Sequence, residues 1–197
     1  MVSLIFLGYT VADFSQFFMR ITRLIALGSV TVLFAACGVD TTGLSAESSK
    51  KPRGNAASSV QIAEFGDLEC PACKSAHDLI NEPLMEKYGS KIAFVYKQFP
   101  LNMHPYAMEA AEASECAADQ GKFWEFADAM FAGQDKLGSA FYEETAGTLG
   151  LKLDQFKSCV SSRKYEAKVR AQESAGLAVG VRGTPGSFVN GIELGGA

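Results

Sequence analysis

The feature that most constrains this chain is a pair of cysteines two residues apart, placed where a predicted strand ends and a predicted helix begins. The apolar residues 60–65 predict a buried strand, and residues 71–88 predict a helix that starts just after Cys70 and contains Cys73. A helix N-terminus leaves backbone N–H groups unpaired and carries a partial positive charge. Such a position lowers the pKa of a cysteine from about 8.5 to roughly 3.5–7.5. The sequence therefore predicts a redox-active pair in which Cys70 readily forms a thiolate.

The composition limits the other classes of function. A length of 197 residues suffices for one domain and a leader, and an apolar content of 48% is enough to build a core. The net charge of −4 argues against a nucleic-acid partner. Two histidines are too few for a histidine-rich metal site, so we predict no metal.

The N-terminal part predicts a lipoprotein signal peptide. Arg20 and Arg23 precede an apolar run, 24–34, which is short for a membrane span of about 20 residues and ends shortly before Cys37. This ending resembles a bacterial lipobox, in which the cysteine is lipidated and becomes the first mature residue. The alternative is a buried cysteine at the end of a core helix. Residues 1–36 are thus interpreted as an upstream extension, with translation starting at Met19, followed by the signal peptide.

The segment 37–59 is rich in Ser, Thr, Gly, Ala and Lys, with almost no large apolar residue. This composition predicts a flexible linker between a lipid anchor at Cys37 and a domain at 60–197. A structured N-terminal extension is the alternative. A lipid anchor implies an exported protein in the bacterial cell envelope, on the periplasmic or extracytoplasmic face, where a stable disulfide is permitted.

The domain reads as an α/β fold interrupted by helices. Strands at 60–65 and 91–99, joined by the helix 71–88, predict a right-handed parallel crossover. A hairpin follows much later, with a turn at Asn190-Gly191 between strands 187–190 and 192–194. Because an open sheet needs both faces covered, we expect one more helix after residue 197 and interpret the sequence as truncated. Between the second and third strands, about 104–179, five helices are predicted, at 104–120, 123–131, 139–149, 154–161 and 164–179.

Three features together carry a family resemblance. They are the C-P-A-C motif at 70–73, the helical block, and the segment 181–185, V-R-G-T-P, before the hairpin. With Q-G-K-F-W at 120–124, they resemble the DsbA-type branch of the thioredoxin superfamily, including its lipid-anchored members. The resemblance covers roughly 60–197 and implies a thioredoxin fold with an all-helical insertion between the second and third strands.

The resemblance also implies roles for single residues. Cys70 would be the exposed nucleophile, Cys73 the more buried resolving thiol, and Pro185 a cis proline packed against the pair. Thr184 would present its backbone to an extended substrate peptide. The predicted substrate-binding residues are Gly183, Thr184, Pro71 and Ala72. No cofactor is implied beyond the Cys70–Cys73 disulfide itself.

The predicted function is a protein thiol-disulfide oxidoreductase, more specifically an oxidase acting on unfolded or reduced secreted proteins. A membrane redox partner would recycle the dithiol, and we expect a monomer. Ala72 stands where the best-known oxidases of this branch carry histidine, which puts the oxidising strength in question. A reductase or isomerase on the same fold is therefore an alternative. Less favoured are a metal-binding protein using Cys70, Cys73 and His77, and a non-catalytic chaperone.

Acidic residues near the motif suggest a proton acceptor for Cys73. Glu64, Asp67 and Glu69 are the candidates, with Glu64 on the predicted strand. The favoured interpretation of Asp67 and Glu69 is that they are solvated turn residues. His104 is interpreted as a helix-start residue and Lys74 as an exposed helix charge.

Two further cysteines, Cys116 and Cys159, fall in the helical insertion. In an oxidising compartment we expect them to form a structural disulfide, which the chain-entropy model values at roughly 3–4 kcal/mol. With this pairing every cysteine has a predicted role: one is lipidated, two form the redox pair and two form the structural disulfide. Spacing alone does not bring their α-carbons together, and two separate buried thiols are the alternative.

Overall fold

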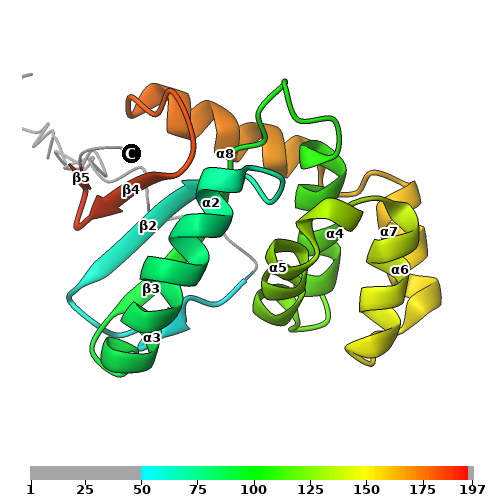
Figure 1. Ribbon diagram of the computed structural model, residues 1–197, viewed down its shortest axis with the longest axis horizontal. Helices are drawn as coiled ribbons and strands as arrows, with labels where there is room; N and C mark the ends of the chain where they lie inside the picture. Colours follow the sequence, from blue (N-terminus) through cyan, green and yellow to red (C-terminus); the bar gives the residue numbers. More distant parts are fainter. Residues whose placement is uncertain (1–49, 195–197) are drawn as a thin grey trace, which may run out of the picture. The chain divides into compact units, whose positions relative to one another are not determined.

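The computed structural model describes residues 50–194, and these form a five-stranded mixed sheet with helices on both faces (Figure 1). The strands lie in the order β1-β3-β2-β4-β5. β2 and β3 are parallel, and the other three neighbouring pairs are antiparallel. The strand bounds are Arg53–Gly54 for β1, Gln61–Gly66 for β2, Ala93–Gln98 for β3, Gly186–Val189 for β4 and Ile192–Leu194 for β5.

The crossover from β2 to β3 confirms the predicted parallel pair, but its helix is not regular. The predicted helix 71–88 consists of α2 (Pro71–Ala76), the π-helical turn η1 (His77–Asn81) and α3 (Glu82–Tyr88). The break precedes Pro83, which has no backbone N–H for the helical ladder. A widened π-turn there allows the chain to continue without that hydrogen bond.

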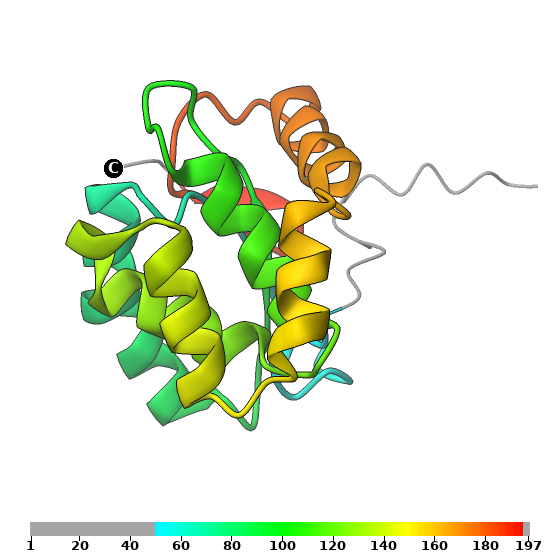
Figure 2. The same cartoon turned by 90° about the vertical axis from the view of Figure 1, so that its right-hand side faces the viewer.

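The helical insertion between β3 and β4 is confirmed. Its helices begin and end within about three residues of the predicted positions, because their apolar periodicity and flanking glycines are clear in the sequence. In Figure 2 these helices stand side by side, and α8 (Glu166–Ala178) lies against the sheet, where Gln172 accepts a hydrogen bond from the backbone N–H of Gln98 in β3. Among residues 50–194, none of the helices is both long enough and apolar enough to cross a bilayer. The helices are α4 (Ala107–Ala118), α5 (Phe123–Ala132), the 3₁₀ turn η2 (Gln134–Lys136), α6 (Ser139–Thr148), α7 (Leu153–Ser161) and α8 (Glu166–Ala178).

The C-terminal hairpin is also confirmed. Asn190 has φ 48° and Gly191 has φ 81°, so both turn residues adopt the left-handed conformation that a type I′ turn requires. The turn pairs Val189 with Ile192. The expected further helix falls outside the described residues.

Two apolar cores lie on opposite faces of the sheet. The larger fills the space between the sheet and the helical insertion, and it includes Phe94, Phe126 and Phe156. The smaller contains Phe65, Phe99, Val181 and Phe188. Gly176 lets α8 approach this second core, because a side-chain carbon there would lie 2.7 Å from Phe99 and 2.9 Å from Phe65.

The prediction of a flexible linker up to residue 59 is wrong for residues 50–59. Arg53 and Gly54 pair with Phe94 and Ala93 as strand β1. The Lys50 ammonium is buried, lies 2.6 Å from a Glu115 carboxylate oxygen, and sits 3.7 Å from the centre of the Phe123 ring. Composition pointed to a solvated segment, but this lysine and the backbone of β1 find partners only in the folded domain. The remainder of the predicted linker, the signal peptide and Cys37 lie outside the described residues.

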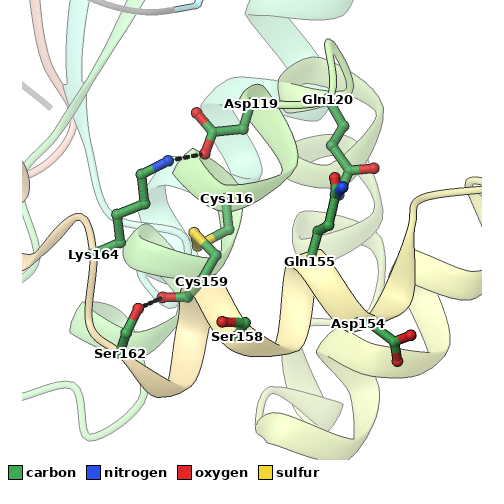
Figure 3. Close-up of a pocket in the computed structure, with 9 residues that line it drawn as sticks. All are labelled: Cys116, Asp119, Gln120, Asp154, Gln155, Ser158, Cys159, Ser162 and Lys164. Carbon is green, nitrogen blue, oxygen red and sulfur yellow. Dashed lines mark hydrogen bonds and ion pairs between the residues drawn. A yellow bond between two sulfur atoms is a disulfide. The ribbon is translucent and has the colours of Figure 1, made fainter.

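A disulfide braces the helical insertion. Cys116 in α4 and Cys159 in α7 are bonded, with their α-carbons 5.9 Å apart and a separation of 43 positions in sequence. Figure 3 shows the bond beside the Asp119–Lys164 ion pair, in a hollow of about 500 Å³. The bond therefore closes a loop that spans most of the insertion.

Replacing both of these cysteines with alanine is expected to lower the free energy of unfolding by about 3–4 kcal/mol, because the unfolded chain regains the entropy of the opened loop. Denaturant titration of the wild type and the double variant measures this loss. A loss below about 1 kcal/mol would mean that this disulfide does not brace the domain.

Candidate active site

Cys70 caps the N-terminus of α2. Its backbone is extended, with φ −73° and ψ 124°, and Pro71 occupies the first turn, where a missing N–H costs no helical hydrogen bond. Cys73, one turn further on, is completely buried. Both are free thiols in this structure. Cys70 is only 6% exposed, so the expectation of an exposed nucleophile is wrong for this state of the protein.

The pKa values of the two thiols are shifted in opposite directions. A hydrogen bond from the Cys73 thiol is the main cause that lowers the pKa of Cys70 to about 5. Burial opposes this shift, and contact with Thr184 and the backbone N–H groups at the start of α2 reinforce it. The same hydrogen bond and burial raise the pKa of Cys73. At neutral pH Cys70 is therefore a thiolate and Cys73 a thiol.

Thr184 and Pro185 form the wall opposite the cysteines. The peptide bond between them is cis, and the Cys70 sulfur lies 3.5 Å from the Thr184 carbonyl oxygen. β4 begins directly after this dipeptide, where Gly186 pairs with Phe65 of β2. β2 leads into Cys70, and β4 leads away from Pro185. The register of these two strands therefore places Cys70 next to Thr184 and Pro185.

Glu64 is a buried carboxyl on β2, with 2% of its surface exposed. Burial raises the pKa of Glu64 to about 7, although hydrogen bonds from Asn81, at 3.0 and 3.2 Å, and from Ser187 oppose the shift. Tyr96 pairs with Glu64 across the sheet, and its pKa is raised by burial and by the charges of Cys73 and Glu64. Glu64 can thus gain or lose a proton near neutral pH on the same side of the sheet as Cys73.

Asp67 is buried, which contradicts its interpretation as a solvated turn residue. Its backbone N–H donates to the Cys73 sulfur at 3.4 Å. Its carboxylate accepts hydrogen bonds from the backbone N–H groups of Leu101, at 2.9 Å, and Glu69, at 2.8 Å, and lies 2.6 Å from Nδ1 of His104. Glu69, half-buried, accepts from a backbone N–H of the same loop. Both acids therefore connect the active-site turn to the loop after β3.

Residues 48–197 match the family model described as Thioredoxin. The chain belongs to the thioredoxin family. Its fold is that of the DsbA-type members, as three solved structures show. These are BdbD from Bacillus subtilis (20% identity, TM-score 0.66, 74% of this chain and 84% of that one), alpha-DsbA1 from Wolbachia pipientis (23%, 0.65, 74% and 82%) and a thioredoxin-like oxidoreductase from Silicibacter pomeroyi (23%, 0.69, 80% and 88%).

The curated relatives are much longer proteins. The chain is 39% identical over 140 residues to the Na(+)/H(+) antiporter NhaA 3 of Salinispora tropica and 38% identical over 140 residues to NhaA 1 of Salinispora arenicola. In each case the match covers 71% of this chain and 21% of the relative. The thioredoxin-family chain therefore spans about a fifth of the length of these proteins. Their names describe the complete proteins, of which this chain matches only one part.

A groove lies beside the dithiol of this thioredoxin-family chain. It has a volume of about 580 Å³, and its lining includes Ala72, Leu79, Ile80, Pro185 and Leu194, together with Glu64. Leu79 and Ile80 on η1 are strongly exposed. Of the predicted substrate-binding residues, Pro71, Ala72 and Gly183 are exposed and Thr184 is half-buried. The arrangement offers an apolar surface next to a reactive sulfur.

His77 belongs to a separate cluster. Its ring stacks on Phe131, with centroids 4.7 Å apart, and its nitrogens lie 3.7 Å from carboxylate oxygens of Glu82 and Asp128. Arg53 is hydrogen-bonded to both of those carboxylates. The guanidinium compensates one of these two negative charges.

Sequence reasoning missed the residues that support the motif from a distance. Gln134 of η2 donates to the carbonyl oxygens of Leu68, at 2.9 Å, and Cys70, at 3.0 Å. Lys74 donates to the carbonyl oxygen of Phe131 at 2.8 Å. No local signal marks Gln134, because its partners are 64 and 66 residues away in sequence.

Proposed function

We propose that this chain is a protein thiol-disulfide oxidoreductase that works as an oxidase, taking electrons from cysteine pairs of secreted or envelope proteins. The observation that carries the proposal is the environment of Cys70, a thiolate at a helix N-cap that faces the cis Thr184–Pro185 bond. Stabilising the thiolate stabilises the reduced dithiol, and a stable reduced form makes the disulfide a strong oxidant.

The reaction starts from the Cys70–Cys73 disulfide. A substrate thiolate attacks the Cys70 sulfur, the bond between Cys70 and Cys73 breaks, and Cys73 leaves with the electron pair. The second substrate thiolate then attacks the substrate sulfur of the mixed disulfide, and Cys70 leaves as a thiolate. The substrate loses two electrons and two protons and gains a disulfide. Of these protons one stays on Cys73 and the other passes to solvent.

We propose that Glu64 donates a proton to Cys73 and accepts it back. The Cys73 sulfur is buried, so a thiolate formed there is costly and must take up a proton at once. Glu64 is also buried, and its pKa of about 7 means that both of its protonation states are accessible at neutral pH. It therefore suits transfer in both directions of the reaction.

Substrate would lie along the backbone of Thr184 and in the adjoining groove. The Thr184 carbonyl is close to the reacting sulfur, and an extended peptide passing it can form strand-like hydrogen bonds. Leu79, Ile80 and Leu194 supply exposed apolar contacts. Such a surface suits unfolded chains of varied sequence.

The proposed setting is the cell envelope. A lipid on Cys37 would hold the domain at a membrane, and a membrane redox partner would reoxidise the dithiol. Both proposals rest on the N-terminal sequence and on the fold. After every turnover the reduced dithiol must pass two electrons to an external acceptor to re-form the Cys70–Cys73 disulfide.

Capture of the intermediate tests the function. When oxidised by a small disulfide, Cys73→Ser carries a mixed disulfide on Cys70, and a reduced substrate protein is expected to displace the small thiol and remain attached. With a substrate protein that has a single cysteine, neither the serine hydroxyl nor a second substrate thiolate can resolve the bond, so the complex accumulates. Non-reducing electrophoresis with peptide mapping identifies it. The Cys116→Ala/Cys159→Ala variant, which keeps Cys70 and Cys73, is the control and should capture none. Attachment through a sulfur other than Cys70 would refute the proposed mechanism.

A further inference from the structure

His104 is held against the active-site turn through a fully buried partner. Nδ1 of His104 lies 2.6 Å from Oδ2 of Asp67, whose side chain has no exposed surface. The backbone of Asp67 contacts both redox residues, since its N–H donates to the Cys73 sulfur and its carbonyl accepts from the Cys70 N–H at 3.1 Å. The histidine is thus attached to a residue of the turn whose backbone is hydrogen-bonded to both cysteines.

The loop that carries His104 is fixed at three points. Leu101 donates its backbone N–H to the Asp67 carboxylate, and Tyr106 donates its own to the Glu69 carboxylate at 2.6 Å. His104 lies between these two anchors in sequence and provides the third contact. The imidazole is therefore placed by the fold beside the turn, although it belongs to the segment between β3 and α4.

The groups that face His104 are anionic. Burial alone lowers the pKa of His104, but the hydrogen bond and charge of Asp67 outweigh it and raise the pKa above its usual range. The charges of Cys70 and Glu69 act in the same direction. His104 is therefore positively charged over a wider range of pH than a free histidine, and Cys70 is among the charges it interacts with.

We propose that His104, held by Asp67, is the positioning residue whose imidazolium stabilises the Cys70 thiolate in the reduced protein. The methyl group of Ala72 offers neither a charge nor a hydrogen-bond donor between the two cysteines. His104 brings a cation to the same thiolate from another part of the chain. The inference rests on the proposed redox function of the Cys70–Cys73 pair and adds a residue that contributes to its oxidising strength.

The coupling must act in both directions. The reduced protein has a thiolate at Cys70, whereas the disulfide is neutral, so the reduced form should hold the His104 proton more tightly. Protonation of His104 favours the reduced form. This contribution is present at pH values below the pKa of His104 and is lost as the pH rises through it, so the oxidised protein becomes a weaker oxidant there.

Nuclear magnetic resonance of the two histidine rings tests this on the wild-type protein. We expect the pKa of His104 to be higher in the reduced than in the oxidised protein by about one pH unit, the order of shift that one opposite charge produces. The variant His77→Asn assigns the signals. Equal pKa values for His104 in the two states would overturn the inference.

The variant His104→Asn gives the reciprocal measurement. Its amide nitrogen is as far from Cβ as Nδ1 of histidine, so it can still donate to Asp67 but carries no charge. The thiolate absorbance of Cys70 should titrate about one pH unit higher than in the wild type, a roughly tenfold weaker ionisation. His77→Asn should leave that titration unchanged. An unchanged titration in a folded His104→Asn protein would contradict the inference.

These measurements need no substrate and are therefore separable from the proposed function. If the titration moves as expected but reduced proteins are not oxidised, the oxidase proposal fails and the role of His104 stands. If reduced proteins are oxidised and the titration does not move, the role of His104 fails and the oxidase proposal stands.

Discussion

Cys70→Ser is expected to abolish the oxidation of reduced substrate proteins, leaving only the rate seen without the domain. A hydroxyl cannot form a disulfide, so neither the attack on the Cys70 sulfur nor the mixed disulfide exists in this variant. The residue caps α2 through its backbone, which serine can reproduce, so the fold should be retained. The measurement is the recovery of a reduced enzyme that needs its disulfides, followed with stoichiometric oxidised domain.

The matched control for this experiment is the variant Cys116→Ala/Cys159→Ala, which removes the structural disulfide of the helical insertion. It should oxidise substrate at close to the wild-type rate at a temperature where circular dichroism shows it to be folded. Equal, slow oxidation by the wild type and Cys70→Ser would refute the proposed function.

Glu64→Gln is expected to stabilise the domain in a pH-dependent way while slowing exchange. The native pKa of Glu64 is about 7, against an ordinary value of 4.5, because the carboxyl is buried. The folded state therefore holds a proton that the unfolded state releases between about pH 4.5 and 7, and stability falls as pH rises through this window. At about 1.4 kcal/mol per pH unit, the cost of the buried charge approaches 3 kcal/mol above pH 8.

Glutamine is neutral at every pH and avoids that cost. The variant should match the wild type near pH 4 and exceed it by about 3 kcal/mol at pH 8 in denaturant titration. Reaction with glutathione should slow by on the order of 10²-fold, because the proton of Cys73 loses its carrier. Glu193→Gln, which removes an exposed carboxylate from β5, is the control for net charge. A stability gain that is the same at pH 4 and pH 8 would show that Glu64 is not the titrating group.

The secondary-structure elements around the active site could be predicted from the sequence, because they depend on residues that are close together in the chain. The strand before Cys70, the helix after it and the Asn190-Gly191 turn follow from periodicity, capping and backbone preference, which act over a few residues. The Cys70–Cys73 pair could be assigned its chemistry because the helix N-terminus that activates it lies next to it in the chain.

The environment of the dithiol could not be predicted in the same way. Asp67 resembles an ordinary turn residue in the sequence, and its burial depends on donors 34 and 37 residues further along, at Leu101 and His104. Lys50 was assigned to a linker because its partner, Glu115, is 65 residues away. Charged groups at such separations become paired only once the fold has brought their elements together. The hydrophobic periodicity of the sequence, which indicates helices and strands, does not predict such pairs.

The most direct test of the account is a redox titration of the whole protein against glutathione, with the free cysteines alkylated and mapped at each point. We predict that Cys70 and Cys73 change state together, at a reduction potential well above the −270 mV or so of thioredoxin, toward the roughly −120 mV of strong oxidants of this fold. Cys116 and Cys159 should stay bonded over that range. A Cys70–Cys73 potential at or below about −270 mV, or a pair that does not close reversibly, would contradict the proposed oxidase.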